Sequence, residues 1–161
     1  MDCSLYGISI EHEAGESGNA LQTAAIQGSK DTVQLLLEHQ VDVNAQGGYY
    51  GNALQAACRR GHRDIVILLL ENQVNVNAEG GQYGNAFQAA AYTGHEDIVQ
   101  LLLDHKGDVN AQGGYYGSAL KAASRSGYQD IVQLLLDHKV NGNTRGEQHG
   151  NALEAAAYAE L

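Results

Sequence analysis

The sequence lacks proline altogether and is poor in cysteine, in basic residues and in long apolar runs. Its two cysteines, Cys3 and Cys58, lie in unrelated surroundings. They therefore do not make a disulfide framework, and they favour a reducing compartment. No apolar run approaches the roughly 20 residues that a membrane-spanning helix needs, and the segment MDCSLYGISIEHE lacks the features of a secretory signal. We therefore expect an intracellular protein, either cytoplasmic or nuclear.

The charge balance limits the classes of partner. Nine basic residues stand against 19 acidic ones, which makes the formal net charge −10. Binding to phosphate groups requires clustered lysine and arginine. Neither nucleic acid nor a membrane is therefore expected as a partner. The apolar fraction of 43% is enough for a core, and 161 residues suggest one domain.

Glycine marks the period of the sequence. Gly18, Gly51, Gly84, Gly117 and Gly150 follow one another at 33-residue steps without insertion or deletion. They open nearly identical phrases, from GNALQTAA to GNALEAAA, and phrases such as DIVQLLLDH lie between them. A fixed period of this length predicts a solenoid, in which each unit buries its apolar face only by stacking on its neighbours.

One unit, residues 51–83, illustrates the expected local structure. Asn52 is a favoured N-cap for an alanine-rich helix predicted over Ala53–Arg60, which Gly61 ends. A second helix is predicted over Asp64–Asn72, followed by a glycine-rich loop. Helices this short are marginal in isolation, below about 12–15 residues, so stacking must stabilise them. The apolar stripe of the second helices predicts these core residues: Leu35, Leu36, Leu68, Leu69, Leu101, Leu102, Leu134 and Leu135.

The period divides the chain into four complete units and two partial ones. Residues 1–17 are either the tail of a preceding repeat or a degenerate N-terminal cap, and 150–161 are a half repeat with a first helix only. This pattern predicts a segment of a longer array or, alternatively, a short protein with degenerate caps. The complete units are 18–50, 51–83, 84–116 and 117–149.

The repeated pattern AL-x-x-AA-x-x-GH-x-x-IV-x-LLL resembles the ankyrin repeat over roughly residues 18–161. Gly61 with His62 and Gly94 with His95 reproduce the Gly-His pair of that family. The phrase GGYYGNALQAA further resembles arrays of fungal NACHT-type multidomain receptors. The resemblance implies an all-α ankyrin-repeat solenoid of 33-residue helix-turn-helix-loop units, with a non-enzymatic protein-binding function and no cofactor.

Two departures from the family pattern have structural consequences. The family's Thr-Pro-Leu-His becomes Asn-Ala-Leu-Gln, so that asparagine capping replaces a proline that only pre-organises the helix start. The glycine that usually follows the second helix is replaced as well, which leaves the geometry of the helix exit open. The replacing residues are Gln40, Gln73, Lys106 and Lys139.

Ankyrin arrays usually bind through loop tips and the inner face of the first helix, and tyrosine and arginine are enriched at interface hot spots. For Tyr50, Tyr83 and Tyr116 the alternative is that their rings only pack into a ladder that rigidifies the loops. Arg59, Tyr92 and Arg125 differ between repeats, as expected of contact residues. The predicted partner-binding residues are Tyr49, Tyr50, Arg59, Arg60, Tyr83, Tyr92, Tyr115, Tyr116, Arg125 and Tyr158.

The spacing of the histidines and acidic residues does not indicate a catalytic or metal site. The resemblance implies inter-repeat hydrogen bonds for His62 and His95, and no ligand cluster of the kind that zinc needs is present.

The leading hypothesis is a protein-recognition module for an unidentified partner. The alternative is a structural or self-associating segment of a larger receptor. A more remote alternative is small-molecule binding or catalysis in the groove at Tyr92 or Arg125.

Overall fold

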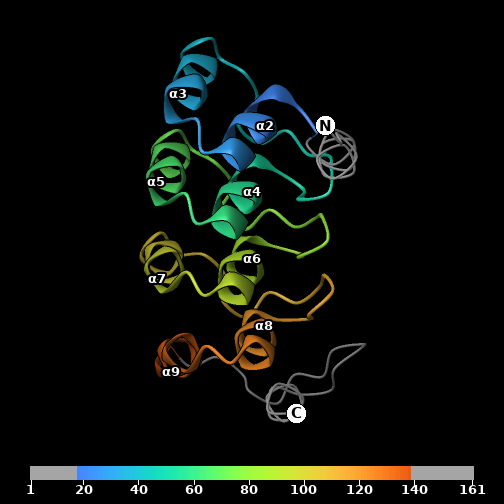
Figure 1. Ribbon diagram of the computed structural model, residues 1–161, viewed down its shortest axis with the longest axis vertical. Coiled ribbons are helices and arrows are strands. Elements are labelled where there is room, and N and C mark those ends of the chain that lie inside the picture. Colours follow the sequence, from blue (N-terminus) through green and yellow to red (C-terminus); the bar gives the residue numbers. More distant parts are fainter. Residues whose placement is uncertain (1–17, 139–161) are drawn as a thin grey trace, which may run out of the picture.

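The computed structural model describes residues 18–138 of the chain. Cys3, Lys139 and Tyr158 lie outside the described residues, as do the two predicted partial units. Figure 1 shows two parallel columns of helices, with the connecting loops on the far side of the first column. The first column holds α2 (Ala20–Gln27), α4 (Ala53–Arg60), α6 (Ala86–Thr93) and α8 (Ala119–Ser126). The second holds α3 (Lys30–Glu38), α5 (Arg63–Glu71), α7 (Glu96–Asp104) and α9 (Gln129–Asp137).

This arrangement confirms the predicted all-α repeat solenoid, and between residues 18 and 138 it contains no regular β-strand. The predicted bounds of α4 agree with the structure, whereas α5 begins and ends one residue earlier than predicted. Neighbouring first helices pack closely on one another, and neighbouring second helices touch less extensively. The alanine-rich sequence of the first helices explains this difference, because small side chains permit close approach.

The first helices begin and end in the same way in every described unit. The side chain of Asn52 accepts a hydrogen bond from the backbone N–H of Gln55, as predicted for an N-cap. Asn19, Asn85 and Ser118 cap the other first helices in the same manner. Gly61 ends α4 in the left-handed conformation with φ 74°, where glycine meets no Cβ penalty.

The sequence did not determine the backbone geometry at the end of the second helix. Gln40, Gln73 and Lys106 all take left-handed backbone conformations, with φ of 56°, 62° and 59°. The exit therefore has the geometry that glycine usually provides, although the side chains here make it strained.

Each loop folds into a narrow hairpin closed by a pair of glycines, and successive hairpins are joined. The N–H of Gly80 donates to the carbonyl of Gly84 at 2.8 Å within one hairpin. Between hairpins, the N–H of Gln82 donates to the carbonyl of Tyr49, and the N–H of Tyr115 donates to the carbonyl of Gln82, both at 2.9 Å. The loop tips thus form one continuous backbone ladder along the stack.

The core lies between the two columns and continues under the loops. Leu69, Leu102 and Leu135 are fully buried, as predicted. Leu36, Leu68, Leu101 and Leu134 are half-buried and pack against this core. Leu35 is the exception, because 55% of the residue is exposed. Its equivalents in α5, α7 and α9 are covered by the preceding second helix, and among the described residues no second helix precedes α3. The predicted core role of Leu35 is therefore wrong in this structure.

Candidate functional site

Three tyrosine rings, one from each described loop, form a continuous stack along the array. The centroids of Tyr50 and Tyr83 lie 6.3 Å apart and those of Tyr83 and Tyr116 lie 6.5 Å apart, with interplanar angles of 14° and 20°. The three residues are only 9%, 6% and 8% exposed. We call Tyr50, Tyr83 and Tyr116 the tyrosine row. Their rings pack against one another and against the core, and so support the loop ladder from below.

Further tyrosines extend the tyrosine row toward solvent. The ring of Tyr92, from the last turn of α6, stacks on Tyr116 at 4.6 Å and lies 5.8 Å from Tyr83. Tyr49 and Tyr115 contact the row edge-on, at 5.2 Å from Tyr50 and 4.9 Å from Tyr116. Tyr115 is 42% exposed, so the outer edge of this aromatic cluster is open to contact.

Arginines from the ends of the first helices lie over the tyrosine row. The Nε of Arg59 donates to the hydroxyl of Tyr83 at 2.9 Å, and its guanidinium lies 5.5 Å from the ring centroids of both Tyr83 and Tyr92. The guanidinium of Arg60 lies 5.9 Å from the ring of Tyr50. These distances are in the range of cation–π attraction. The aromatic rings therefore hold the arginines in defined positions at the surface.

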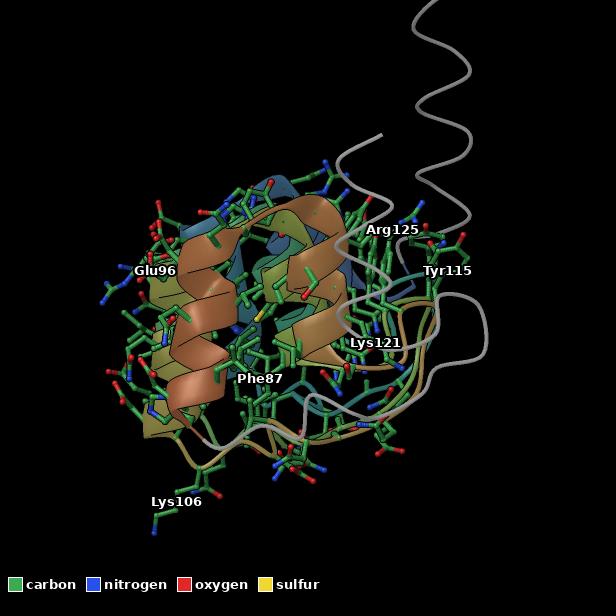
Figure 2. All side chains as sticks on the ribbon, turned by 90° about the horizontal axis from the view of Figure 1, so that it is seen from below. Phe87, Glu96, Lys106, Tyr115, Lys121 and Arg125 are labelled. Carbon is green, nitrogen blue, oxygen red and sulfur yellow. The ribbon has the colours of Figure 1, made fainter. Side chains whose placement is uncertain are left out.

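Arg125 occupies the position of Arg59 two repeats further on. Figure 2 places Arg125 and Tyr115 on the same side of the array, opposite Glu96 on α7. The pKa of the Tyr116 hydroxyl is raised, chiefly by burial, and the charge of nearby Arg125 opposes this rise only slightly. The structure thus gathers every predicted site residue between 18 and 138 on one side of the array, with Tyr50, Tyr83 and Tyr116 buried beneath the others. We call the set Tyr49, Arg59, Arg60, Tyr92, Tyr115 and Arg125 the Tyr/Arg surface.

The environment of this surface affects its ionisable groups. Burial raises the pKa of the Tyr116 hydroxyl, and its hydrogen bond with Tyr92 raises it further. Burial lowers the pKa of the Arg59 guanidinium, but the hydrogen bond to Tyr83 and the nearby phenols outweigh this and raise it overall. Tyr116 is therefore a neutral phenol and Arg59 a permanent cation at physiological pH.

Two buried glutamines, which the sequence reasoning did not single out, attach the loops to the first helices, whereas the side chain of Gln88 at the equivalent position of the third unit is buried without such a bond. The Nε2 of Gln22 donates to the carbonyls of Ala45 and Gly51, both at 3.2 Å. Gln55 makes the equivalent bond to Ala78 at 3.0 Å. The signal in the sequence is the constant glutamine of the Asn-Ala-Leu-Gln phrase. In the fourth unit Lys121 takes this position and is equally buried, directed from α8 toward the loop side (Figure 2).

His62 and His95 each form a hydrogen bond to the preceding unit, as the family resemblance implied. The Nε2 of His62 lies 3.2 Å from the carbonyl oxygen of Ile26 in the preceding unit. His95 makes the equivalent bond to the backbone of Arg59. Burial is the main reason that the pKa of His95 is lowered, with Asp97 acting in the opposite direction. These histidines stabilise the stack beneath the arginines and are not surface groups for chemistry.

Other kinds of site find little support within residues 18–138. No group of three histidine, cysteine or acidic side chains there is placed to hold a metal ion. Burial raises the pKa of the Cys58 thiol, which lies fully enclosed in the core. The helices of this part of the chain are too short and too polar to cross a bilayer. A shallow groove of about 540 Å³ lies between α3 and α5 on the second column.

Comparison with known proteins follows the same repeated units. A family model described as ankyrin repeats (3 copies) matches residues 3–80 and 78–146. The chain belongs to the ankyrin-repeat family. No curated protein gives a significant match. Ankyrin repeats are generally protein–protein interaction modules and typically lack enzymatic activity, so the Tyr/Arg surface is the candidate binding site.

Proposed function

We propose that this ankyrin array recognises a protein partner through its Tyr/Arg surface. The observation that carries the proposal is the contact of Arg59 with Tyr83 and Tyr92, which holds a guanidinium at the surface over aromatic rings. Tyrosine and arginine contribute large contact energies at interfaces when they are held in place before binding. The buried tyrosine row supports this surface and contributes only its exposed edge.

A triple alanine variant of Arg59, Tyr92 and Arg125 tests the proposal. A matched control replaces Gln34, Gln100 and Gln133 by alanine. These glutamines occupy equivalent positions on the second helices and pair there with acidic residues four positions on. Partners captured by the wild-type chain are identified by mass spectrometry, and the melting temperatures of all three proteins are compared.

We expect partners to be lost with the Tyr/Arg variant and retained with the glutamine variant. Unchanged capture by a folded Tyr/Arg variant would remove the Tyr/Arg surface from the proposal. Tyr158 and the assignment to arrays of fungal NACHT-type receptors remain predictions, and so does an intracellular location.

A structural role is the second candidate, and it has an observation of its own. Leu35 on α3 and Leu136 on α9 are 55% and 46% exposed at opposite ends of the described stack. Exposed leucines at both ends favour end-to-end association of copies or continuation of the array. Replacement of both by glutamate should abolish any concentration-dependent increase of mass in light scattering. A wild-type chain that is monomeric at every concentration would exclude self-association.

A further inference from the structure

The groove of about 540 Å³ between α3 and α5 is bounded on the α5 side by one continuous helix face. Asp64, Ile67, Leu68 and Glu71 line it, and their i, i+3, i+4 and i+7 spacing places them on the same face. Ile67 and Leu68 are half-buried, whereas the two acidic residues are exposed. The α5 side therefore has an apolar middle between a carboxylate in the first turn and another in the last.

The α3 side of the groove differs from the α5 side in the charge of its first turn. Lys30 begins the helix, the half-buried Leu37 faces the middle of the groove, and the exposed Glu38 ends the helix. At the first-turn end, Lys30 and Asp64 carry opposite charges. At the last-turn end, Glu38 and Glu71 are both acidic, and neither helix has a basic residue in its last turn. Because helix C-termini carry partial negative charge as well, this end of the groove attracts cations.

At this groove the sequence of α5 departs from that of the other described second helices. Gln34, Gln100 and Gln133 each donate a hydrogen bond to the acidic residue four positions on, at 3.1, 2.9 and 2.8 Å. Ile67 occupies the equivalent position in α5 and cannot make this bond. Within the described part of the chain, no hydrogen bond holds the carboxylate of Glu71. The departure therefore adds an apolar side chain to the groove and leaves a carboxylate beside it without its usual glutamine.

The spacing of charged and apolar side chains along the groove matches that of another helix. Asp64 and Glu71 are seven residues apart, or about 10.5 Å along the axis at 1.5 Å per residue. In a partner helix, adjacent arginines at positions i and i+1 are separated by about 100° around the axis, and leucines at i+4 and i+8 fall between them in angle, at about 40° and 80°. These leucines face the same groove as the arginine pair and lie about 6 and 12 Å further along the axis.

We propose that the groove binds an amphipathic helix of a protein partner, with a basic pair at its N-terminal end and an apolar stripe after it. The partner helix runs antiparallel to α3 and α5, so that its basic pair meets Glu38 and Glu71 in charge-assisted hydrogen bonds. Its first leucine packs on Ile67 and Leu68, and its second lies against the methylene stem of Lys30. Apolar anchors at helical spacing are the usual basis of binding of a helix in a groove.

This surface lies apart from the Tyr/Arg surface. The groove belongs to the second column of helices (Figure 1), whereas Arg125 and Tyr115 lie on the opposite side of the array (Figure 2). The inference thus goes beyond the proposed function, and the two can be tested with different residues.

The probe is a fluorescein-labelled helical peptide of eighteen residues built from alanine and glutamine. It carries an arginine pair near its N-terminus and leucines four and eight residues after the first arginine. Binding to the full chain is measured by fluorescence anisotropy. Four comparison peptides each change one feature: alanines replace the leucines, glutamates replace the arginines, the arginine pair follows the leucines instead of preceding them, or a central proline breaks the helix.

Two protein variants alter the groove with little risk to the fold. Ile67→Gln introduces the residue that the other described second helices have at this position. Glu38→Gln with Glu71→Gln removes the two carboxylates. The matched control is Asp104→Asn with Asp137→Asn, which removes the equivalent carboxylates of α7 and α9 and makes the same change of net charge.

The triple alanine variant of Arg59, Tyr92 and Arg125 serves here as a second control. It alters the Tyr/Arg surface and leaves the groove unchanged. The melting temperatures of all variants are compared with that of the wild type, so that loss of binding can be separated from loss of folding.

We expect the probe to bind at least tenfold more tightly than each comparison peptide, a difference of about 1.4 kcal/mol. Ile67→Gln and the double variant of Glu38 and Glu71 should each weaken its binding about tenfold. The double variant of Asp104 and Asp137 and the triple alanine variant should bind the probe as the wild type does.

Other outcomes overturn the inference in distinguishable ways. Equal binding of the peptide without leucines excludes the apolar contact, and equal binding of the glutamate peptide excludes recognition of basic charge. Equal binding of the peptide with the displaced arginine pair excludes the antiparallel orientation, and equal binding of the proline peptide assigns the groove to an extended segment. If light scattering shows that the wild type is an oligomer and Ile67→Gln is a monomer, a second copy of the chain occupies the groove.

Two further results separate this inference from the proposed function. Loss of probe binding in a folded triple alanine variant would place the peptide on the Tyr/Arg surface and not in the groove. If no peptide binds, the inference is wrong, whereas capture of partners that depends on Arg59, Tyr92 and Arg125 would still support the proposed function.

Discussion

The guanidinium of Arg59 and the hydroxyl of Tyr83 join the first helix and the loop of one repeat through a hydrogen bond of 2.9 Å. Arg59 lies in the last turn of α4, and Tyr83 ends the loop that leads from this unit into the next. The bond therefore couples the position of a surface cation to the stacking of the loops. Binding surface and scaffold share the same residues in this array.

Removal of the Tyr83 hydroxyl should weaken the stack. Tyr83→Phe keeps the ring in the tyrosine row but removes the acceptor of the Arg59 bond, and we expect a loss of roughly 1 kcal/mol in the free energy of unfolding. Tyr50→Phe is the matched control, since the described residues show no hydrogen bond to its hydroxyl. Urea unfolding measures both variants. Equal stability of the two would show that the bond contributes nothing.

Alanine substitutions at two helix-ending glycines, Gly61 and Gly127, distinguish the cost of backbone strain from the cost of a steric clash. At Gly61, with φ 74°, an added Cβ would clash with the Cε1 atom of His95, whereas at Gly127, with φ 76°, it would meet no atom of the described residues within 4 Å. Gly127→Ala should therefore cost only the left-handed strain, about 1–2 kcal/mol. Gly61→Ala should cost more, because the histidine ring must move. Equal losses in thermal unfolding would show that the ring yields freely.

The strained exit of the second helix predicts a stabilising substitution. Gln73 has φ 62°, and glycine adopts this conformation without a steric penalty. Gln73→Gly should raise the free energy of unfolding by about 0.5–1 kcal/mol, the left-handed penalty less the entropy of glycine. Glu71→Gly, in the last turn of α5, is the control and should destabilise. A loss of stability in both variants would contradict this account.

His95 should make stability depend on pH. Burial lowers the pKa of His95 below its ordinary value of 6.5, so the unfolded chain takes up a proton first as the pH falls. This contribution to stability is complete above pH 6.5 and decreases as the pH falls from there toward the lower pKa of the folded state. Unfolding measured between about pH 7.5 and 5.5 brackets that ordinary value.

His95→Gln and His95→Tyr, the second matching Tyr128 in the next unit, remove the titrating group. As the pH falls over this range, the free energy of unfolding of both variants should decrease less than that of the wild type. If their stabilities fall as steeply as that of the wild type, the pH dependence comes from other groups.

The sequence by itself determined the helix pairs, their period and their order. These follow from local chemistry: Asn52 caps a helix, Gly61 ends it, and the apolar stripe of α5 requires a neighbour. The same regularity predicted which residues recur and which vary, and so grouped the residues that form the Tyr/Arg surface.

Only the tertiary structure decided which tyrosines are buried and which are exposed. Tyr49 and Tyr50 are adjacent in the sequence, yet the hairpin directs Tyr50 into the stack and leaves Tyr49 at its edge. Likewise, Leu35 and Leu68 occupy equivalent positions, and their exposure differs because α3 covers Leu68 while no described helix covers Leu35. Burial depends on what lies beside a residue in space, and a repeated sequence gives equivalent residues the same conformation without giving them the same neighbours.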